Sequence, residues 1–215
     1  MYYLSFDVAN KSLAVSFVNY DIDYKSKLNN LDKTNICNYI SKVNDIVSNV
    51  VNYIYGDVID LIPNKKLKDS TIQERTLSLK QSLQKIKNIV NETINSDEKI
   101  TLIIEYQMCQ NYNANAIYNQ IIYEFTEQRY NIFVIKPCYK NKIYFSKDLE
   151  YGEFIAKYNN NYTANKAHTK ANFLYFLEKH NMLDKIKNIK KKNIDDLADS
   201  FIQIFAYIKY HLQDN

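Results

Sequence analysis

Glycine, proline and cysteine are scarce in this sequence. Of its 215 residues, 2 are Gly, 2 are Pro and 3 are Cys. Actin-like and sugar-kinase ATPases bind phosphate on glycine-rich loops, where backbone amides approach the anion closely. Two glycines cannot form such loops, so this class of ATPase is excluded. The cysteines are widely spaced and match no zinc or redox pattern, which indicates a reducing compartment; they are Cys37, Cys109 and Cys138.

Long hydrophobic runs are missing as well. No apolar segment approaches the length that spans a membrane. Asp7 interrupts the apolar N-terminal stretch and no cleavage site follows it, so no signal peptide is expected. We therefore expect a soluble, intracellular protein with no membrane partner. Hydrophobic residues make up 46% of the chain and charged residues 24%, as in ordinary globular proteins. This length favours one domain spanning residues 1–215.

A short apolar run in the middle of the chain ends on an acid. Residues 101–104 are rich in β-branched side chains and predict a strand buried on both faces. The run ends at Glu105. A carboxylate at the end of a core strand is costly unless a metal, a base or a partner charge satisfies it. A carboxylate pointing into water explains Glu105 equally well, so its weight depends on similar placements elsewhere.

The N-terminal segment shows the same placement. Residues 2–6 form an apolar run that ends at Asp7, and the short connection to a second run at 13–18 predicts an antiparallel hairpin. If this strand is the neighbour of the one that ends at Glu105, Asp7 lies mid-sheet beside it. The alternative is an aspartate that serves only a turn.

A C-terminal helix carries a third acidic group. At roughly 100° per residue its apolar side chains cover one broad face: Leu197, Ala198, Phe201, Ile202, Ile204, Phe205 and Ile208. Asp196, Asp199, Ser200 and Gln203 share the narrow polar stripe that is left. The alternative to a functional role is that acids in the first turn of a helix interact favourably with the helix dipole. This explanation fits Asp195 best, as a candidate N-cap.

The remaining pattern predicts the element order β-β-(α)-β-α-β-α-β-α-α. Strands are expected at 2–7, 13–19, 58–62, 101–105 and 132–136, and helices at about 32–55, 71–95, 113–128 and 166–181. Gly56 stands where the first of these helices should be capped. From 139 to 165 the pattern dissolves into Lys, Tyr and Asn. We expect a flexible, substrate-facing loop or a poorly packed insertion there.

Lysine supplies nearly all the positive charge. The net charge of +4 is too small to indicate nucleic acid by itself. A basic run precedes the acidic stripe and comprises Lys185, Lys187, Lys190, Lys191 and Lys192. Such a run would suit a polyanion that lies across an acidic metal site, although a solvated segment explains it too. Lys166 and Lys170 fall in the first turns of a predicted helix, where cations oppose the helix dipole. An anionic ligand or simple solvation accounts for them.

Taken together, these pieces resemble the RuvC-type Holliday junction resolvases of the RNase H-like superfamily. The likeness is greatest to the branch found in poxviruses and related large DNA viruses. It rests on residues 4–14, 103–107 and 195–201, with further likeness at 57–62 and 74–75. It covers most of the chain except the helix at about 32–55, which looks like an insertion, and the loop at about 139–165. Ala9 stands where the family usually has Gly.

This resemblance implies an α/β fold with a mixed five-stranded sheet flanked by helices. Carried over residue by residue, it implies four catalytic, metal-binding acids: Asp7, Glu105, Asp196 and Asp199. It also implies a catalytic lysine in the helix at 166–181, which Lys170 matches best and Lys166 second. DNA contacts are expected from Lys166, Lys190, Lys191 and Lys192.

The implied activity is Mg²⁺-dependent resolution of four-way DNA junctions by symmetric paired nicks, carried out by a homodimer. Two divalent ions ~4 Å apart can activate a water and stabilise the departing 3′ oxygen. Hard oxygen ligands hold such ions, and Mn²⁺ is expected to substitute. We expect Asp7 to bridge both ions, Glu105 to hold one, and Asp196 and Asp199 to hold the other.

Two alternatives stay open on the sequence alone. One is another RNase H-like nuclease, which acts on RNA–DNA hybrids or as an exonuclease and shares the same acids. The other is a catalytically inactive protein that only binds junctions. Intact acids at all four positions argue against the second, because buried carboxylates without a use are costly. If the protein is viral, it acts in the infected host cell.

Overall fold

The computed structural model describes residues 1–20, 42, 46, 49, 51–107 and 110–211. Its strands are β1 (Tyr2–Val8), β2 (Ser12–Tyr20), β3 (Val51–Asp60), β4 (Ile100–Glu105) and β5 (Tyr130–Ile135). Its α-helices are α3 (Ile72–Thr93), α4 (Tyr112–Glu124), α5 (Tyr151–Ile155), α6 (Asn161–Lys179) and α7 (Ile194–His211). Short 3-10 helices are η1 (Leu67–Asp69), η2 (Pro137–Lys142), η3 (Lys147–Leu149), η4 (Leu183–Ile186) and η5 (Lys191–Asn193).

The strands form one mixed sheet in the order β3-β2-β1-β4-β5. β1 and β2 make the expected antiparallel hairpin, and β3 continues it antiparallel to β2. β4 lies parallel to β1 and β5 parallel to β4. Phe6 is opposite Ile104 in the β1–β4 ladder. The residues that follow them, Asp7 and Glu105, are therefore at the same edge of the sheet.

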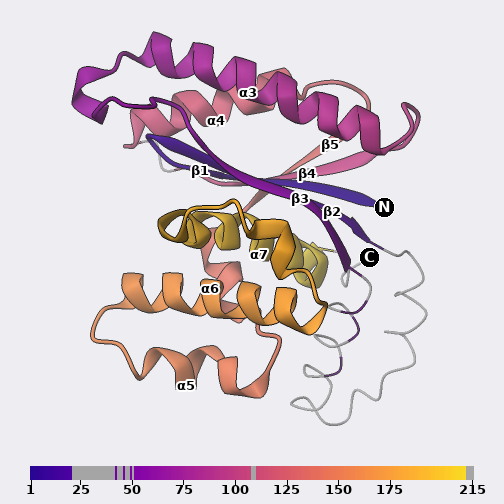
Figure 1. Cartoon of the computed structure of the whole chain (residues 1–215), viewed down its shortest axis with the longest axis vertical. Coiled ribbons are helices and arrows are strands. Elements are labelled where there is room, and N and C mark those ends of the chain that lie inside the picture. The colour runs from indigo at the N-terminus through magenta and orange to yellow at the C-terminus, as the bar shows by residue number, and fades with distance from the viewer. Residues whose placement is uncertain (21–41, 43–45, 47–48, 50, 108–109, 212–215) are drawn as a thin grey trace.

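Helices cover both faces of this sheet (Figure 1). α3 and α4 lie on one face, while α7 lies against the other with α6 behind it and α5 outermost. The central strand β4 is buried on both faces, as its apolar sequence predicts. Leu102 and Ile104 belong to the core under α3 and α4, whereas Ile103 belongs to the core under α7. The α/β class, with a five-stranded mixed sheet flanked by helices, is confirmed.

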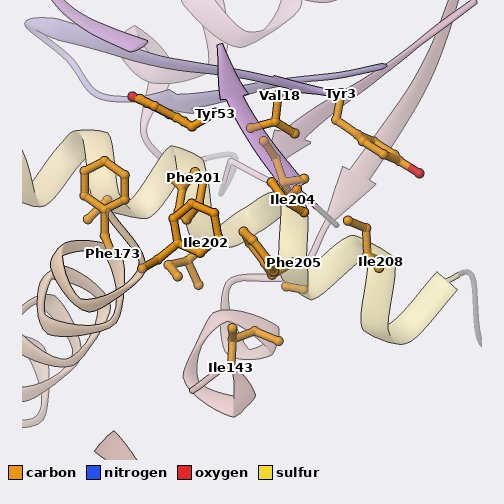
Figure 2. Packing of buried hydrophobic residues seen from close by; sticks show 14 of the residues in the cluster. Tyr3, Val18, Tyr53, Ile143, Phe173, Phe201, Ile202, Ile204, Phe205 and Ile208 are labelled. Atoms are coloured by element: carbon orange, nitrogen blue, oxygen red, sulfur yellow. The ribbon is translucent and has the colours of Figure 1, made fainter. Parts of the chain in front are cut away.

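The apolar face of α7 fixes how this helix is rotated on the sheet. Figure 2 shows Phe201 between the sheet and α6, whereas Phe205 points away from the sheet. The ring of Phe201 lies 5.4 Å from that of Tyr53 in β3 and 4.9 Å from that of Phe173 in α6. Burying one such side chain contributes roughly 1.5–3 kcal/mol. Because this face is large and fully buried, the narrow polar stripe of α7 has one defined direction.

The long helix α3 has a sequence-encoded start. The Thr71 side chain accepts a hydrogen bond from the Glu74 amide at 3.1 Å, and the Glu74 carboxylate accepts one from the Thr71 amide at 3.0 Å. This reciprocal pair is a capping box, which satisfies two amides that the helix leaves free. The helix expected at 71–95 is confirmed within a residue or two at each end. No helix in the described part of the chain is long and apolar enough to cross a membrane.

The expected helix at 32–55 is wrong at its C-terminal end. Residues 51–55 belong to β3, and Gly56 lies within that strand instead of capping a helix. Val51 and Tyr53 are buried, and the whole strand is paired with β2. The ladder hydrogen bonds and this burial override the helical spacing of the apolar residues. Residues 32–41 and most of 42–50 lie outside the described residues.

The expected loop at 139–165 contains regular structure. It holds parts of η2 and α6 together with η3 and α5, and α6 begins at Asn161, five residues before its expected start. Asn160 caps α6, because its side chain accepts hydrogen bonds from the amides of Tyr162 and Thr163. Asn is a good N-cap, but in a segment so rich in Asn the sequence does not show which residue serves.

Candidate active site

Two acids lie at one edge of the sheet because two parallel strands end there. Asp7 is near the end of β1 and Glu105 closes β4, as expected if these strands are neighbours. Both side chains are largely buried, with 15% and 16% of their surfaces exposed. A turn role does not account for Asp7, because it lies within the β1 ladder opposite Ala14.

α7 brings the third acidic group to the same edge. Its polar stripe faces the sheet: the Ser200 hydroxyl is 2.7 Å from that of Ser16 in β2, and Gln203 accepts a hydrogen bond from the Ser5 hydroxyl at 3.0 Å. The Gln203 amide nitrogen then donates to Asp7 Oδ1 at 3.3 Å and to Glu105 Oε2 at 3.4 Å. Gln203 is fully buried. It therefore ties the helix to both strand-end carboxylates.

Lys140 lies at the centre of three carboxylates. Its ammonium nitrogen is 2.5 Å from Glu105 Oε2, 3.6 Å from Asp199 Oδ1 and 3.9 Å from Asp7 Oδ1. Its side chain is only 11% exposed. Nothing in the sequence distinguishes Lys140 for this role, because it stands in a Lys- and Tyr-rich stretch with Lys136 and Lys142 close by.

Lys166 joins the fourth acid to the group. Its ammonium is 2.8 Å from Asp196 Oδ1 and 3.6 Å from Asp199 Oδ2. Lys170, the better sequence match for a catalytic lysine, pairs instead with Asp195 at 2.8 Å. Asp195 lies in the first turn of α7, which starts at Ile194, so it is not the N-cap. Among the two candidate lysines, Lys166 contacts the predicted metal-binding acids.

Burial and like charge dominate the electrostatics of this group. Burial, with the neighbouring carboxylates of Asp199 and Glu105, raises the pKa of Asp7 to about 7, although Lys140 opposes the shift. Burial alone would lower the pKa of Lys140, but the three surrounding carboxylates outweigh it and raise that pKa. The same balance raises the pKa of Lys166, through its hydrogen bond to Asp196 and the charge of Asp199. Both ammonium groups therefore stay charged.

A cavity of about 580 Å³ opens onto these groups. Its polar lining includes Asp7, Glu105, Asp199, Lys140 and Lys166. Asp196 is not part of the lining and reaches the group through Lys166. The rest of the wall comes from η2 and the N-terminal half of α6, apart from one residue of β1: Val8, Pro137, Cys138, Asn141, Tyr162, Asn165 and Thr169.

The donor chemistry of the site fits hard divalent cations. All four acids offer carboxylate oxygens, the ligands that Mg²⁺ and Mn²⁺ prefer. In this arrangement the carboxylates surround two ammonium groups, and no three Asp, Glu, His or Cys side chains of the described residues converge on a common metal position. Because these carboxylates already bind positively charged groups, they suit a metal site that takes its final geometry when the ion binds.

The predicted DNA-binding lysines before α7 are only partly brought together. Lys190 and Lys192 line a second cavity of about 370 Å³, with Lys11 from the β1–β2 turn. Lys191 is exposed and is not part of that lining. Lys11 lies 3.8 Å from Asp60 in β3, so one of the three cationic groups at this cavity already has an acidic partner.

Comparison with known proteins confirms the fold. No protein-family model and no curated protein matches the sequence. Among solved structures, the chain is similar to the fowlpox virus resolvase in complex with Holliday junction DNA, with a TM-score of 0.55 and 18% identity over 97% of each chain. Another structure of the fowlpox virus Holliday junction resolvase gives a TM-score of 0.54 at 16% identity, over 97% of this chain and 98% of that one.

The bacterial protein RuvC from Thermus thermophilus is similar as well. The TM-score is 0.50 at 9% identity, over 97% of this chain and 96% of RuvC. These likenesses extend over nearly the whole of each chain. The RuvC-type, RNase H-like fold expected from residues 4–14, 103–107 and 195–201 is therefore confirmed.

Proposed function

We propose that this protein is a divalent-metal-dependent endonuclease that resolves four-way DNA junctions. One observation carries the proposal: carboxylates from three distant parts of the chain, Asp7, Glu105 and Asp199, lie within 3.9 Å of a single ammonium nitrogen in a cavity. The RuvC-type fold supports it, because a fowlpox virus protein of this fold was solved with Holliday junction DNA.

Divalent ions bound here would supply an activated water and would neutralise charge on the phosphate and the leaving oxygen. The chain's own carboxylates would hold these ions: Asp7 and Glu105 at the ends of two strands, and Asp196 and Asp199 on α7. Gln203 keeps the carboxylates of Asp7 and Glu105 in place through its amide. Hydrolysis therefore depends on residues of β1, β4 and α7 together.

Lys166 is the residue that orients the phosphate of the scissile bond. It lines the cavity, whereas Lys170 does not, and its ammonium is already within 3.6 Å of two of the acids. A fixed positive charge close to the reacting phosphate stabilises the charge that develops in the transition state. Lys190 and Lys192 bind backbone phosphates farther from the cut, where their contribution is to affinity.

Symmetric resolution needs two active sites, because nicks must fall on two opposing strands. The described part of one chain carries one such acidic group, so the proposal includes a homodimer that holds one junction. A four-way junction is the substrate class for which paired sites are required, whereas a hybrid duplex or a free end needs one.

A direct test measures how the purified protein cuts three nucleic-acid substrates. In Mg²⁺ or Mn²⁺ we expect symmetric nicking of a synthetic four-way junction and little cutting of a linear duplex or an RNA–DNA hybrid. Asp7→Asn and Glu105→Gln remove a ligand charge and should abolish cutting while junction binding persists. Gel-resolved cleavage and a mobility-shift assay on the same preparations give both readouts.

Each other outcome points to a different protein. Cutting of the hybrid alone identifies an RNase H-like nuclease of another specificity. Tight junction binding without cutting by the unaltered protein identifies an inactive binding protein. Retained cutting in either acid variant removes that residue from the metal site.

A further inference from the structure

Lys140 is in an unusual place for a lysine of a metal-dependent site. It lies among carboxylates that are proposed metal ligands, and its ammonium is closest to Glu105 Oε2, at 2.5 Å. Asp199 and Asp7 complete the surround at 3.6 and 3.9 Å. Three carboxylates this close to one point repel one another unless a cation lies between them. Lys140 supplies that cation.

We propose that Lys140 is an exchangeable counter-ion: it holds the acids together in the metal-free protein, and its ammonium leaves the acidic group when divalent ions bind. This inference rests on the proposed metal-dependent function and adds a step to it. Lys140 then sets the metal concentration at which the protein becomes active. It is a positioning residue, because it acts on the acids and not on the substrate.

The two cations exclude each other on grounds of space and charge. An oxygen that ligates Mg²⁺ lies roughly 2.1 Å from the ion. Glu105 Oε2 already has the Lys140 ammonium 2.5 Å away, on the side where Asp199 and Asp7 also face. An ion placed among these carboxylates would lie against the ammonium, and the repulsion between the two is strong in a buried site.

Open space lies beside the Lys140 side chain. The side chain forms part of the wall of the 580 Å³ cavity, so rotation about its side-chain bonds moves the ammonium into open space. The backbone around Lys140 stays in place during this rotation. The Lys140 carbonyl accepts a hydrogen bond from the Ile143 amide at 3.1 Å, and Ile143 and Phe145 anchor the following segment in the core. The exchange is a side-chain movement on a fixed segment.

Lys166 does not meet the same description. Its side chain is 26% exposed, more than twice the 11% of Lys140. Its ion pairs are with two of the three acids of α7, whereas the strand-end carboxylates of Asp7 and Glu105 pair with Lys140. An ion bound by Asp7 and Glu105 therefore displaces Lys140 first.

The test measures metal binding by the full chain without DNA. Lys140→Met keeps the length of the side chain and removes its charge. In a calorimetric titration with Mn²⁺, we expect this variant to bind the ion more tightly than the unaltered protein does, by roughly tenfold or more, because the competing charge of the lysine is gone. Lys142→Met removes the same charge two residues away, at an exposed side chain outside the acidic group, and should change affinity by less than about twofold, since solvent screens it.

Stability gives a second readout that does not depend on cleavage. Without metal, Lys140→Met should melt at a lower temperature than the unaltered protein, because three buried carboxylates lose their partner. With saturating Mn²⁺ the difference should disappear. Lys140→Arg keeps the charge and should restore metal-free stability. If Lys140→Met does not fold without metal, Lys140→Gln, which retains a donor for Glu105, replaces it in both measurements.

The outcomes separate this inference from the proposed function. Equal or weaker Mn²⁺ affinity in Lys140→Met, with clear binding by the unaltered protein, overturns the exchange and leaves the metal-dependent function standing. Absence of Mn²⁺ binding in both proteins overturns the metal-dependent function and the exchange together.

Discussion

At the scale of single residues, the chemistry of the site depends on which lysine contacts which acid. Lys166 and Lys170 lie one helical turn apart on α6, yet they pair with different partners. Lys166 contacts Asp196 and Asp199 beside the cavity, whereas Lys170 pairs with Asp195 outside it. One turn of helix thus separates a site lysine from a supporting ion pair.

Replacing these two lysines should give very different rates. We expect Lys166→Met to slow single-turnover junction cleavage by about 100-fold, the typical effect of removing one group that stabilises transition-state charge. Lys170→Met should change the rate by less than about threefold, because it loses only a partly exposed ion pair. Comparable losses in both variants would contradict the assignment of the phosphate-orienting role to Lys166 alone.

At the scale of elements, the position of α7 on the sheet decides where two of the acids lie. The helix is held by its aromatic face on one side and by serine and glutamine hydrogen bonds on the other. β3 must come close to the start of α7 for this packing. Gly56 makes the approach possible: a Cβ at this position would overlap the Tyr53 hydroxyl and lie 2.9 Å from Leu197 Cδ1.

The two glycines of the chain offer a matched pair of substitutions. Gly56→Ala should lower the free energy of unfolding by about 1–3 kcal/mol, the usual cost of forcing atoms into a packed core. Gly152→Ala should be neutral or should stabilise by up to about 1 kcal/mol, because nothing lies within 4 Å of its Cβ and alanine favours helix α5. Urea denaturation of both variants checks this. A Gly56→Ala protein as stable as the unaltered chain would mean that β3 and α7 can separate slightly.

At the scale of the whole molecule, segments far apart in the sequence meet at one edge of the sheet. Gln203 bonds Glu105 across 98 residues and Asp7 across 196. The stability of the folded chain is therefore linked to the charge of this group. Below about pH 7 the folded protein holds a proton on Asp7, whereas the unfolded chain releases it near the ordinary pKa of 3.8.

This linkage predicts the direction of the pH dependence of unfolding. A raised carboxyl pKa means that the folded state binds more protons between pH 4 and 7, so the free energy of unfolding of the metal-free protein falls as pH rises through that range. Asp7→Asn abolishes this contribution and should be more stable than the unaltered protein at pH 8, by roughly 2 kcal/mol. Denaturation at pH 5 and pH 8 without divalent ions measures it. Asp97→Asn, at an exposed position, is the control; a gain equal to that of Asp7→Asn would contradict the role of burial.

By itself, the sequence determined the parts of this protein that follow from local pattern. A core strand that ends on Glu105, a hairpin strand with Asp7 and a helix with one polar stripe each result from neighbours along the chain, so spacing reveals them. The resemblance that these pieces carry implied the fold class, and Asp7 was expected beside Glu105 if their strands were neighbours; the structure confirms both.

Only the tertiary structure decided the rest. Pairing with β2 placed residues 51–55 in a strand, although their apolar spacing continued a helix. Lys140 lies among three acids, and Lys166 replaces Lys170 beside the cavity, because the packing of η2 and α6 against α7 sets which ammonium reaches which carboxylate. The physical reason is that an ion pair depends on distance in space, and nothing local distinguishes one lysine from its neighbours in a chain so rich in them.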